Sequence, residues 1–178
     1  MWDESTRAYL EAVECDRMAK GGQSADLYVE AANMKERVNP AGSFPFKVEC
    51  IKLLETAISL HVQNNRLSNV AKIQKRIAEI YEKDNEFKLS MNFYREAAEN
   101  YSLEQNRSSD YNTCMLKVVD IGIYQAVPDY AELIKILETI ADKYMQNKLT
   151  APSAKDLYFK SVLLFLANED DVGASQAL

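Results

Sequence analysis

The stretch Gln63-Asn64-Asn65-Arg66 closes a segment rich in Ala, Ile and Tyr, and it recurs as Gln105-Asn106-Arg107 and Gln146-Asn147-Lys148, 42 and 41 positions further along each time. A second series runs between these stretches and starts on a serine each time, at Ser24, Ser68, Ser109 and Ser153. Two interleaved series with a period of 41 to 44 residues predict a repeat of two helices. A helix pair of this size cannot bury its own apolar face, so we expect four antiparallel pairs to stack into an all-α solenoid.

Composition sets the broad class of the protein. Its 178 residues suffice for about four helix pairs, and 47% apolar with 27% charged residues is typical of a soluble globular chain. The net charge of −6 argues against nucleic acid as a partner, because neutralising phosphates requires positive charge. Three scattered Cys, a single His and no CxxC predict neither a metal site nor a disulfide framework, and they favour the reducing cytoplasm. No apolar run reaches membrane-spanning length.

About eight helices are predicted, over residues 3–19, 24–37, 46–63, 67–83, 86–104, 108–124, 129–146 and 152–168. The breaks between them are expected at Gly21-Gly22, at 39–42, at Asp84-Asn85 and at Pro128. Helix starts are predicted where a short polar side chain could cap free amide groups, at Ser68, Ser109, Asp129 and Ser153.

Two of the predicted helices show contrasting patterns. In 67–83, Val70, Ile73 and Ile77 fall on one face while Lys72 and Arg76 fall on the opposite face, which is typical of an amphipathic helix. The helix at 152–168 is apolar nearly all round, which predicts cover on several sides. Only residues 168–178 follow it, so we expect a longer natural protein. The alternative is that the last residues fold back over the apolar patch or that a second copy covers it.

No residue pattern indicates an enzyme. His61 is read as a packed or capping side chain, because no nucleophile lies near it in the sequence, and the Cys are read as small buried apolar residues. The basic residues leave two interpretations open: a row that attracts an acidic partner, or solvated helix faces balanced by neighbouring Glu. They recur at similar positions of alternate helices and are Arg66, Lys72, Lys75, Arg76, Arg107, Lys117, Lys148 and Lys155.

Six groups of residues, spread in order over nearly the whole chain, match one known family in identity and spacing. They are Trp2 with Ala8-Tyr9 and Glu11-Ala12, Arg66-Leu67 with Ala71-Lys72, Ile77–Glu82, Ala97-Ala98 with Tyr101, Cys114–Val118, and Ser153–Asp156 with Tyr158–Lys160. These groups resemble the soluble NSF attachment proteins, the SNAP family, of the alpha type. Of the six, Ile77–Glu82 and 153–160 are the most specific.

The resemblance implies a right-handed, tetratricopeptide-like (TPR-like) solenoid, a twisted sheet of antiparallel helix pairs. It also implies an adaptor that binds the four-helix SNARE bundle and recruits the hexameric ATPase NSF. That role belongs to membrane fusion, vesicle-mediated transport and intracellular protein transport, and it is a cytoplasmic, peripheral membrane role without a cofactor. Basic residues on the concave face of the family grip acidic SNARE residues. By matching motif these are Arg66, Lys72, Lys117 and Lys155, and a further basic position of the family falls at Thr113.

The chain also departs from the family. We expect the family's membrane-touching N-terminal segment and its C-terminal bundle, which engages NSF, to lie outside residues 1–178. We therefore expect residues 1–178 to form a single TPR-like repeat domain that corresponds to the central portion. A generic TPR-type scaffold that binds a peptide in its groove is the alternative. The basic residues are spread at one or two per helix, which suits a long rod better than a peptide terminus.

Overall fold

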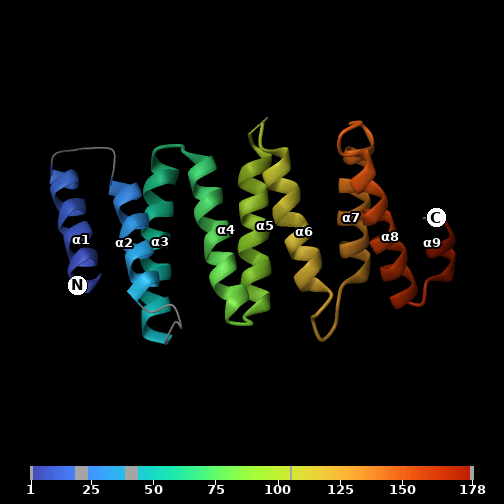
Figure 1. The fold of residues 1–178 in the computed structure, drawn as a ribbon, viewed down its shortest axis with the longest axis horizontal. Coiled ribbons are helices and arrows are strands. Elements are labelled where there is room, and N and C mark those ends of the chain that lie inside the picture. Colours follow the sequence, from blue (N-terminus) through green and yellow to red (C-terminus); the bar gives the residue numbers. More distant parts are fainter. Residues whose placement is uncertain (1, 19–23, 39–43, 105, 177–178) are drawn as a thin grey trace. The chain divides into compact units, whose positions relative to one another are not determined.

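The computed structural model describes residues 2–18, 24–38, 44–104 and 106–176, and within these ranges the chain forms nine α-helices and no strand (Figure 1). The helices are α1 (Trp2–Met18), α2 (Ser24–Val38), α3 (Phe44–Gln63), α4 (Leu67–Lys83), α5 (Phe87–Ser102), α6 (Ser108–Gly122), α7 (Tyr130–Met145), α8 (Ala151–Ala167) and α9 (Asp171–Gln176). Eight of them begin and end within two residues of the predicted bounds. The predicted breaks at Gly21-Gly22 and 39–42 fall outside the described residues.

Helix α9 is absent from the sequence-based prediction. It has only six residues and contains Gly173, so its local propensity is weak. Packing against α8 and a local cap stabilise it instead: Ala174 is buried, and the carboxylate of Asp170, which directly precedes the helix, accepts a hydrogen bond from the Gly173 amide at 2.9 Å. A helix this short depends on packing that a local pattern does not reveal.

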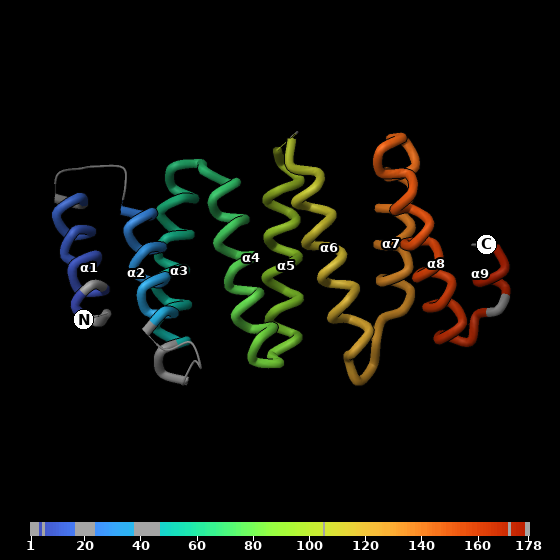
Figure 2. The backbone as a smooth tube through the Cα atoms, viewed as in Figure 1, coloured from blue at the N-terminus to red at the C-terminus, as the bar shows by residue number. Residues whose placement is uncertain are grey.

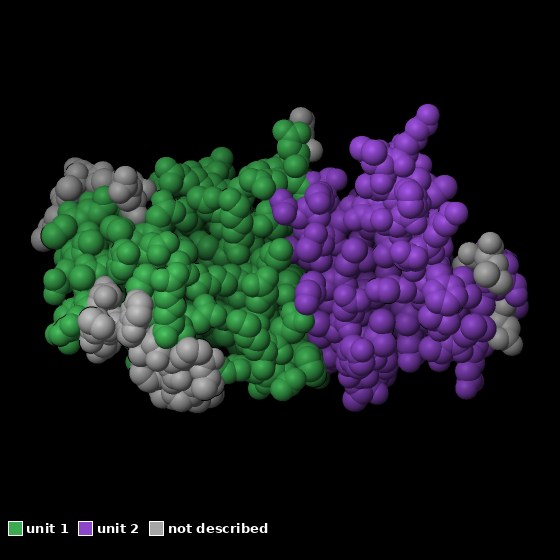
Figure 3. Space-filling model, in the orientation of Figure 1, with its two compact units in different colours: residues 1–107 green, residues 108–178 purple. Residues whose placement is uncertain are grey.

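The chain forms two compact units, residues 1–107 with α1 to α5 and residues 108–178 with α6 to α9 (Figure 3). Within each unit the consecutive long helices run antiparallel beside each other, as the tube in Figure 2 shows. The helix-pair architecture is therefore confirmed. That the two units make a single domain stays a prediction.

The core of the first unit lies where α2, α3 and α4 meet. Leu54 and Ala57 of α3 pack there with Ile73 and Ile77 of α4 and with Ala32 of α2. The predicted apolar face of α4 is confirmed, and the recurring small residues outside it are buried as well, at Ala97, Ala98 and Ala141. Each buried Leu or Ile side chain stabilises the fold by about 1.5–3 kcal/mol.

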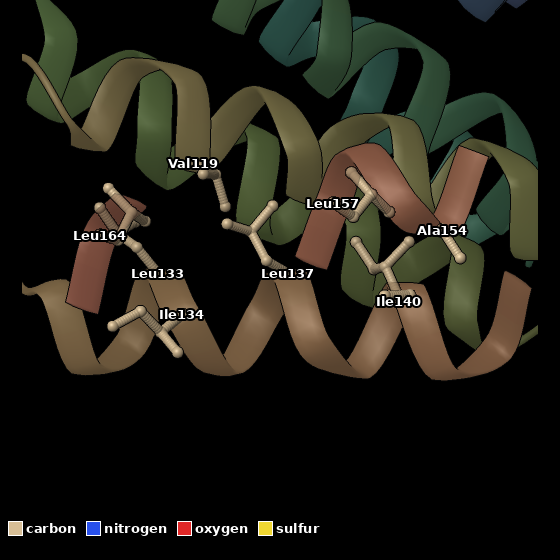
Figure 4. Close-up of a cluster of buried hydrophobic side chains, with 9 residues drawn as sticks. Val119, Leu133, Ile134, Leu137, Ile140, Ala154, Leu157 and Leu164 are labelled. Carbon is tan, nitrogen blue, oxygen red and sulfur yellow. The ribbon is translucent and has the colours of Figure 1, made fainter. Parts of the chain in front are cut away.

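The core of the second unit is built mainly between α7 and α8. Leu133, Leu137 and Ile140 of α7 face Leu157 and Leu164 of α8, and Val119 of α6 joins them (Figure 4). Helix α8 is covered on more than one side, by α7 and by α9, but not all round as its composition predicts. The structure leaves three side chains of α8 largely exposed, those of Phe159, Leu163 and Leu166.

Asparagine ends two helices of the first unit. Asn65 and Asn85 have φ of 54° and 60°, in the left-handed region that few residues other than Gly and Asn adopt readily. After α3 the Arg66 amide donates to the His61 carbonyl and the Asn65 amide to the Val62 carbonyl, both at 2.9 Å, which makes a Schellman motif. The second asparagine does the same after α4. The repeated Gln-Asn stretch thus includes a helix stop at 63–66.

The serine caps are a wrong prediction. Helix α4 begins at Leu67 and α8 at Ala151, so Ser68 and Ser153 lie inside the helices, and neither helix has a side-chain cap. Ser109 likewise follows the first residue of α6. Only Asp129 caps as predicted, because its carboxylate accepts the Glu132 amide at 3.1 Å.

Candidate binding surface

The face of α4 away from its core carries an ion-pair network with α2. The Arg76 guanidinium contacts the Glu36 carboxylate at 2.7 Å and also donates to the Asn33 side-chain oxygen. Lys83 Nζ lies 3.4 Å from the same carboxylate. Burial raises the pKa of Glu36, but the hydrogen bond and charge of Arg76, with a smaller effect of Lys83, outweigh burial and hold the pKa below its usual value. Arg76 therefore joins two helices and belongs with the balanced charges.

Lys72 lies one turn before Arg76 on α4. Four residues correspond to about 40° around the axis, so the two side chains share a face. Lys72 is exposed, and no hydrogen bond or ion pair involves its side chain among the described residues. Arg66, the residue that directly precedes α4, is also exposed, and its backbone is not helical (φ −96°, ψ 64°). Of these two predicted site residues, Lys72 lies within α4 and Arg66 lies just before its first residue.

In the second unit α6 and α8 are joined by an ion pair, in which Lys160 Nζ lies 3.4 Å from the Asp120 carboxylate. Lys117 lies on the same side of α6 as Asp120 and is half-buried. Lys155 of α8 is exposed and lies about 140° around the axis from Lys160, on the side of Phe159. The second pair of predicted site residues therefore comes from alternate helices, with Lys117 on the side of α6 that bears the ion pair and Lys155 away from that ion pair on α8.

Pairing between repeats is the feature that sequence reasoning missed. Glu36 and Arg76 are separated by 40 positions, and so are Asp120 and Lys160. This separation is close to the repeat period, so each pair connects equivalent faces of alternate helices. Opposite charges one period apart are the signal that could have identified these residues in advance. Arg107 is balanced more locally, with its Nε 3.8 Å from the Glu104 carboxylate.

The side chains with potential catalytic chemistry are His61 and the three Cys, and most of them are buried. The His61 side chain is 1% exposed, with Nε2 3.5 Å from an Asp26 oxygen and Nδ1 without a hydrogen-bond partner among the described residues. Burial lowers the pKa of the His61 imidazole, the Asp26 charge raises it, and the Arg66 charge lowers it further. The packed reading of His61 is thus confirmed. Cys50 and Cys114 are buried as predicted, but Cys15 is exposed, because its position on α1 falls on the solvent side.

Metal-binding groups and membrane-spanning helices are both missing from the described part of the chain. No group of three or more His, Cys, Asp or Glu side chains there could hold a metal ion. None of the described helices is long and apolar enough to cross a bilayer.

Comparison with known proteins identifies one family. The family model for soluble NSF attachment protein, SNAP, matches residues 1–178. The alpha-soluble NSF attachment protein of Dictyostelium discoideum is 32% identical over 132 residues, which is 74% of this chain and 44% of that protein. The beta-soluble NSF attachment protein of Bos taurus is 31% identical, covering 99% of this chain and 56% of the relative. The chain spans about half the length of the curated relatives it matches.

A structural comparison agrees on the fold. The crystal structure of BtubC (BKLC) from P. vanneervenii superimposes with a TM-score of 0.62 over 99% of this chain and 70% of that chain, at 13% identity. At 13% identity, this match supports a shared fold and nothing more. With the helix-pair architecture of each unit, it establishes an all-α, TPR-like repeat fold.

Proposed function

Since this chain belongs to the soluble NSF attachment protein family, we propose that it is a non-enzymatic adaptor that binds assembled SNARE complexes and brings the ATPase NSF to them during vesicle trafficking. The observation that carries the proposal is the family match over residues 1–178. The relatives named as vesicular-fusion proteins, such as the sec17 homolog of Schizosaccharomyces pombe at 25% identity, support the same process. The chain would act in the cytoplasm, peripherally to membranes.

The cations that remain available after internal pairing support a SNARE-binding surface. Arg76 and Lys160 are engaged with acidic side chains of their own unit, whereas Arg66, Lys72 and Lys155 are exposed. Together with the half-buried Lys117, these are the positions that match the family's basic residues. We assign the first contact with an acidic SNARE bundle to Lys72 and Lys155, because exposed cations can meet a partner without breaking an internal pair.

Spread cations fit an elongated acidic partner better than a compact one. Each exposed cation contributes little alone, because an exposed ion pair is worth about 0–1 kcal/mol. Several along a bundle add up and speed the encounter, and salt weakens them together. We therefore expect the affinity for a SNARE bundle to fall as ionic strength rises.

Isothermal titration with an assembled SNARE four-helix bundle tests this proposal. The variant Lys72→Glu/Lys155→Glu should lose at least tenfold in affinity. The matched control Lys88→Glu/Lys135→Glu makes the same change in net charge at exposed positions of α5 and α7, and it should bind as the unchanged chain does. Equal losses in both variants would reduce the effect to net charge. Binding to unassembled SNARE segments as strong as to the bundle would favour the generic peptide-binding scaffold instead.

A further inference from the structure

Helix α3, the end of α4 and the start of α5 surround a pocket of about 610 Å³ in the first unit. Its apolar lining comes from Val48 and Ile51 of α3, Tyr81 of α4 and Leu89 of α5. Leu89 is 42% exposed although it is a large apolar residue next to a cavity. The volume lies in the range of pockets that bind ligands, and an apolar floor with a few polar groups is their usual composition.

The charged rim of this pocket is unevenly paired. Lys47 and Asp84 form an ion pair with each other, and Lys52 lies one turn from Glu49 and lowers its pKa, though less than Lys35 does. The two remaining rim carboxylates, Glu55 and Glu86, are not paired in this way. Among the described residues, the side chains of Glu55 and Glu86 have no hydrogen bond or ion pair. With Lys47 and Asp84 paired, these two carboxylates outnumber the one other rim cation, Lys52, so the rim keeps a net negative charge.

These two carboxylates act on the same aromatic side chain. Burial raises the pKa of the Tyr81 hydroxyl, and the charges of Glu55 and Glu86 raise it further. The Tyr81 ring is held by stacking on Phe93, with centroids 5.6 Å apart and planes 18° apart. A fixed aromatic ring therefore lies within electrostatic reach of one carboxylate from α3 and one from the α4–α5 turn.

We propose that this pocket docks an arginine side chain from an extended segment of a partner protein, with the guanidinium between Glu55 and Glu86 and against Tyr81. A guanidinium is planar and weakly hydrated, it binds carboxylates through paired hydrogen bonds, and it stacks on aromatic rings. The pocket is larger than one side chain, so apolar neighbours of the arginine pack on Ile51 and Leu89. An acidic pair over an apolar floor complements a basic residue that is flanked by apolar ones.

This surface is separate from the proposed SNARE contacts. Within the first unit those contacts use Arg66 and Lys72, which are cations, whereas this pocket presents anions on α3 and at the start of α5. An acidic bundle and a basic segment are opposite in charge and do not compete for the same groups. Arginine binding at this pocket is therefore independent of the outcome of the SNARE experiment.

The test uses amide chemical shifts of the full chain, measured by NMR while acetyl-Leu-Arg-Leu-amide is titrated. Shifts should concentrate on residues 47–55, 81–89 and 93. The same tripeptide with citrulline, which keeps the shape but not the charge, should bind at least tenfold more weakly. Arginine amide should also bind more weakly, because it lacks the apolar neighbours. Equal binding of the citrulline peptide would overturn the proposal, and equal binding of arginine amide would exclude a protein segment as the occupant.

Matched variants assign the effect to the two carboxylates. Glu55→Gln/Glu86→Gln should weaken the arginine tripeptide at least tenfold, while Glu79→Gln/Glu99→Gln, which changes the net charge equally at exposed sites outside the pocket, should not. Both variants alter exposed side chains, and a dispersed amide spectrum verifies that each is folded. Unchanged binding to the pocket variant, or an equal loss in both, would refute the assignment.

Discussion

Lys72 and Arg76 lie one turn apart on α4, and reversing the charge of each should affect a different property, binding in one case and stability in the other. Lys72→Glu changes an exposed side chain with no pairing partner among the described residues, whereas Arg76→Glu removes a guanidinium that is 23% exposed and bound to Glu36 and Asn33. Both substitutions change the net charge by the same amount on the same face. We expect the first to weaken SNARE-bundle binding without loss of stability, and the second to destabilise the first unit.

The expected changes in the free energy of unfolding follow from how exposed each side chain is. A hydrogen bond to a charged group contributes about 1.5–3 kcal/mol, and the Glu36 side chain is 40% exposed, so we take a loss of about 2 kcal/mol for Arg76→Glu. For a chain of this length that corresponds to a Tm lower by about 4–8 °C. A surface substitution such as Lys72→Glu should remain within about 0.5 kcal/mol. A like charge placed against an acidic partner costs several kcal/mol, which is more than tenfold in affinity.

Thermal unfolding followed by circular dichroism gives the stabilities, and titration with the assembled bundle gives the affinities. The exchange variant Glu36→Arg/Arg76→Glu is the internal control, because it rebuilds an ion pair with its ends swapped and should recover much of the lost Tm. Equal Tm losses for the two single reversals, or no recovery in the exchange variant, would show that the α2–α4 pair does not account for the difference.

Three further predictions concern stability. Burial lowers the pKa of His61 below its usual 6.5, so in the folded chain the imidazole resists protonation. The contribution of the neutral His61 to stability is complete above pH 6.5 and is lost as the pH falls towards the folded-state pKa, so the Tm drop between pH 7.5 and 5.5 should shrink in His61→Leu. Leu137→Ala removes a fully buried side chain and should cost about 2–5 kcal/mol in chemical denaturation, whereas Leu163→Ala, at 48% exposure, should cost under about 1 kcal/mol. Asn85→Ala should cost about 1 kcal/mol and Asn85→Gly almost nothing, because φ is 60° at this turn; equal losses in both would argue against the left-handed conformation.

The helices and the apolar face of α4 could be predicted from the sequence because both depend on local periodicity. Val70, Ile73 and Ile77 recur at helical spacing, and Asp129 caps the helix that it directly precedes. The predicted cap at Ser68 failed for one non-local and one local reason. The Ser68 hydroxyl donates to the Glu104 carboxylate at 2.7 Å, a partner that lies 36 residues away, while the backbone turn at Asn65 ends α3 immediately before α4 begins.

The candidate site could be predicted only in part. Residue type and position identify cations such as Lys72 and Arg76, but the sequence does not distinguish an available cation from one that is already paired. The difference lies in Glu36, 40 residues earlier on another helix. The pocket was missed for a similar reason, since Ile51 and Leu89 come from α3 and α5, and α4 separates them in the chain.

The ion pairs that join equivalent faces of alternate helices have a consequence for how such a sequence can diverge. Glu36 and Arg76, and likewise Asp120 and Lys160, hold opposite charges at a fixed separation of 40 positions. A change of sign at one member leaves like charges facing each other until the other member changes too. Among homologues we therefore expect these positions to covary, with the sign inverted at both or at neither. An insertion or deletion between the members would shift the two charges out of alignment, so the helical segments between them should keep a constant length while their individual residues drift.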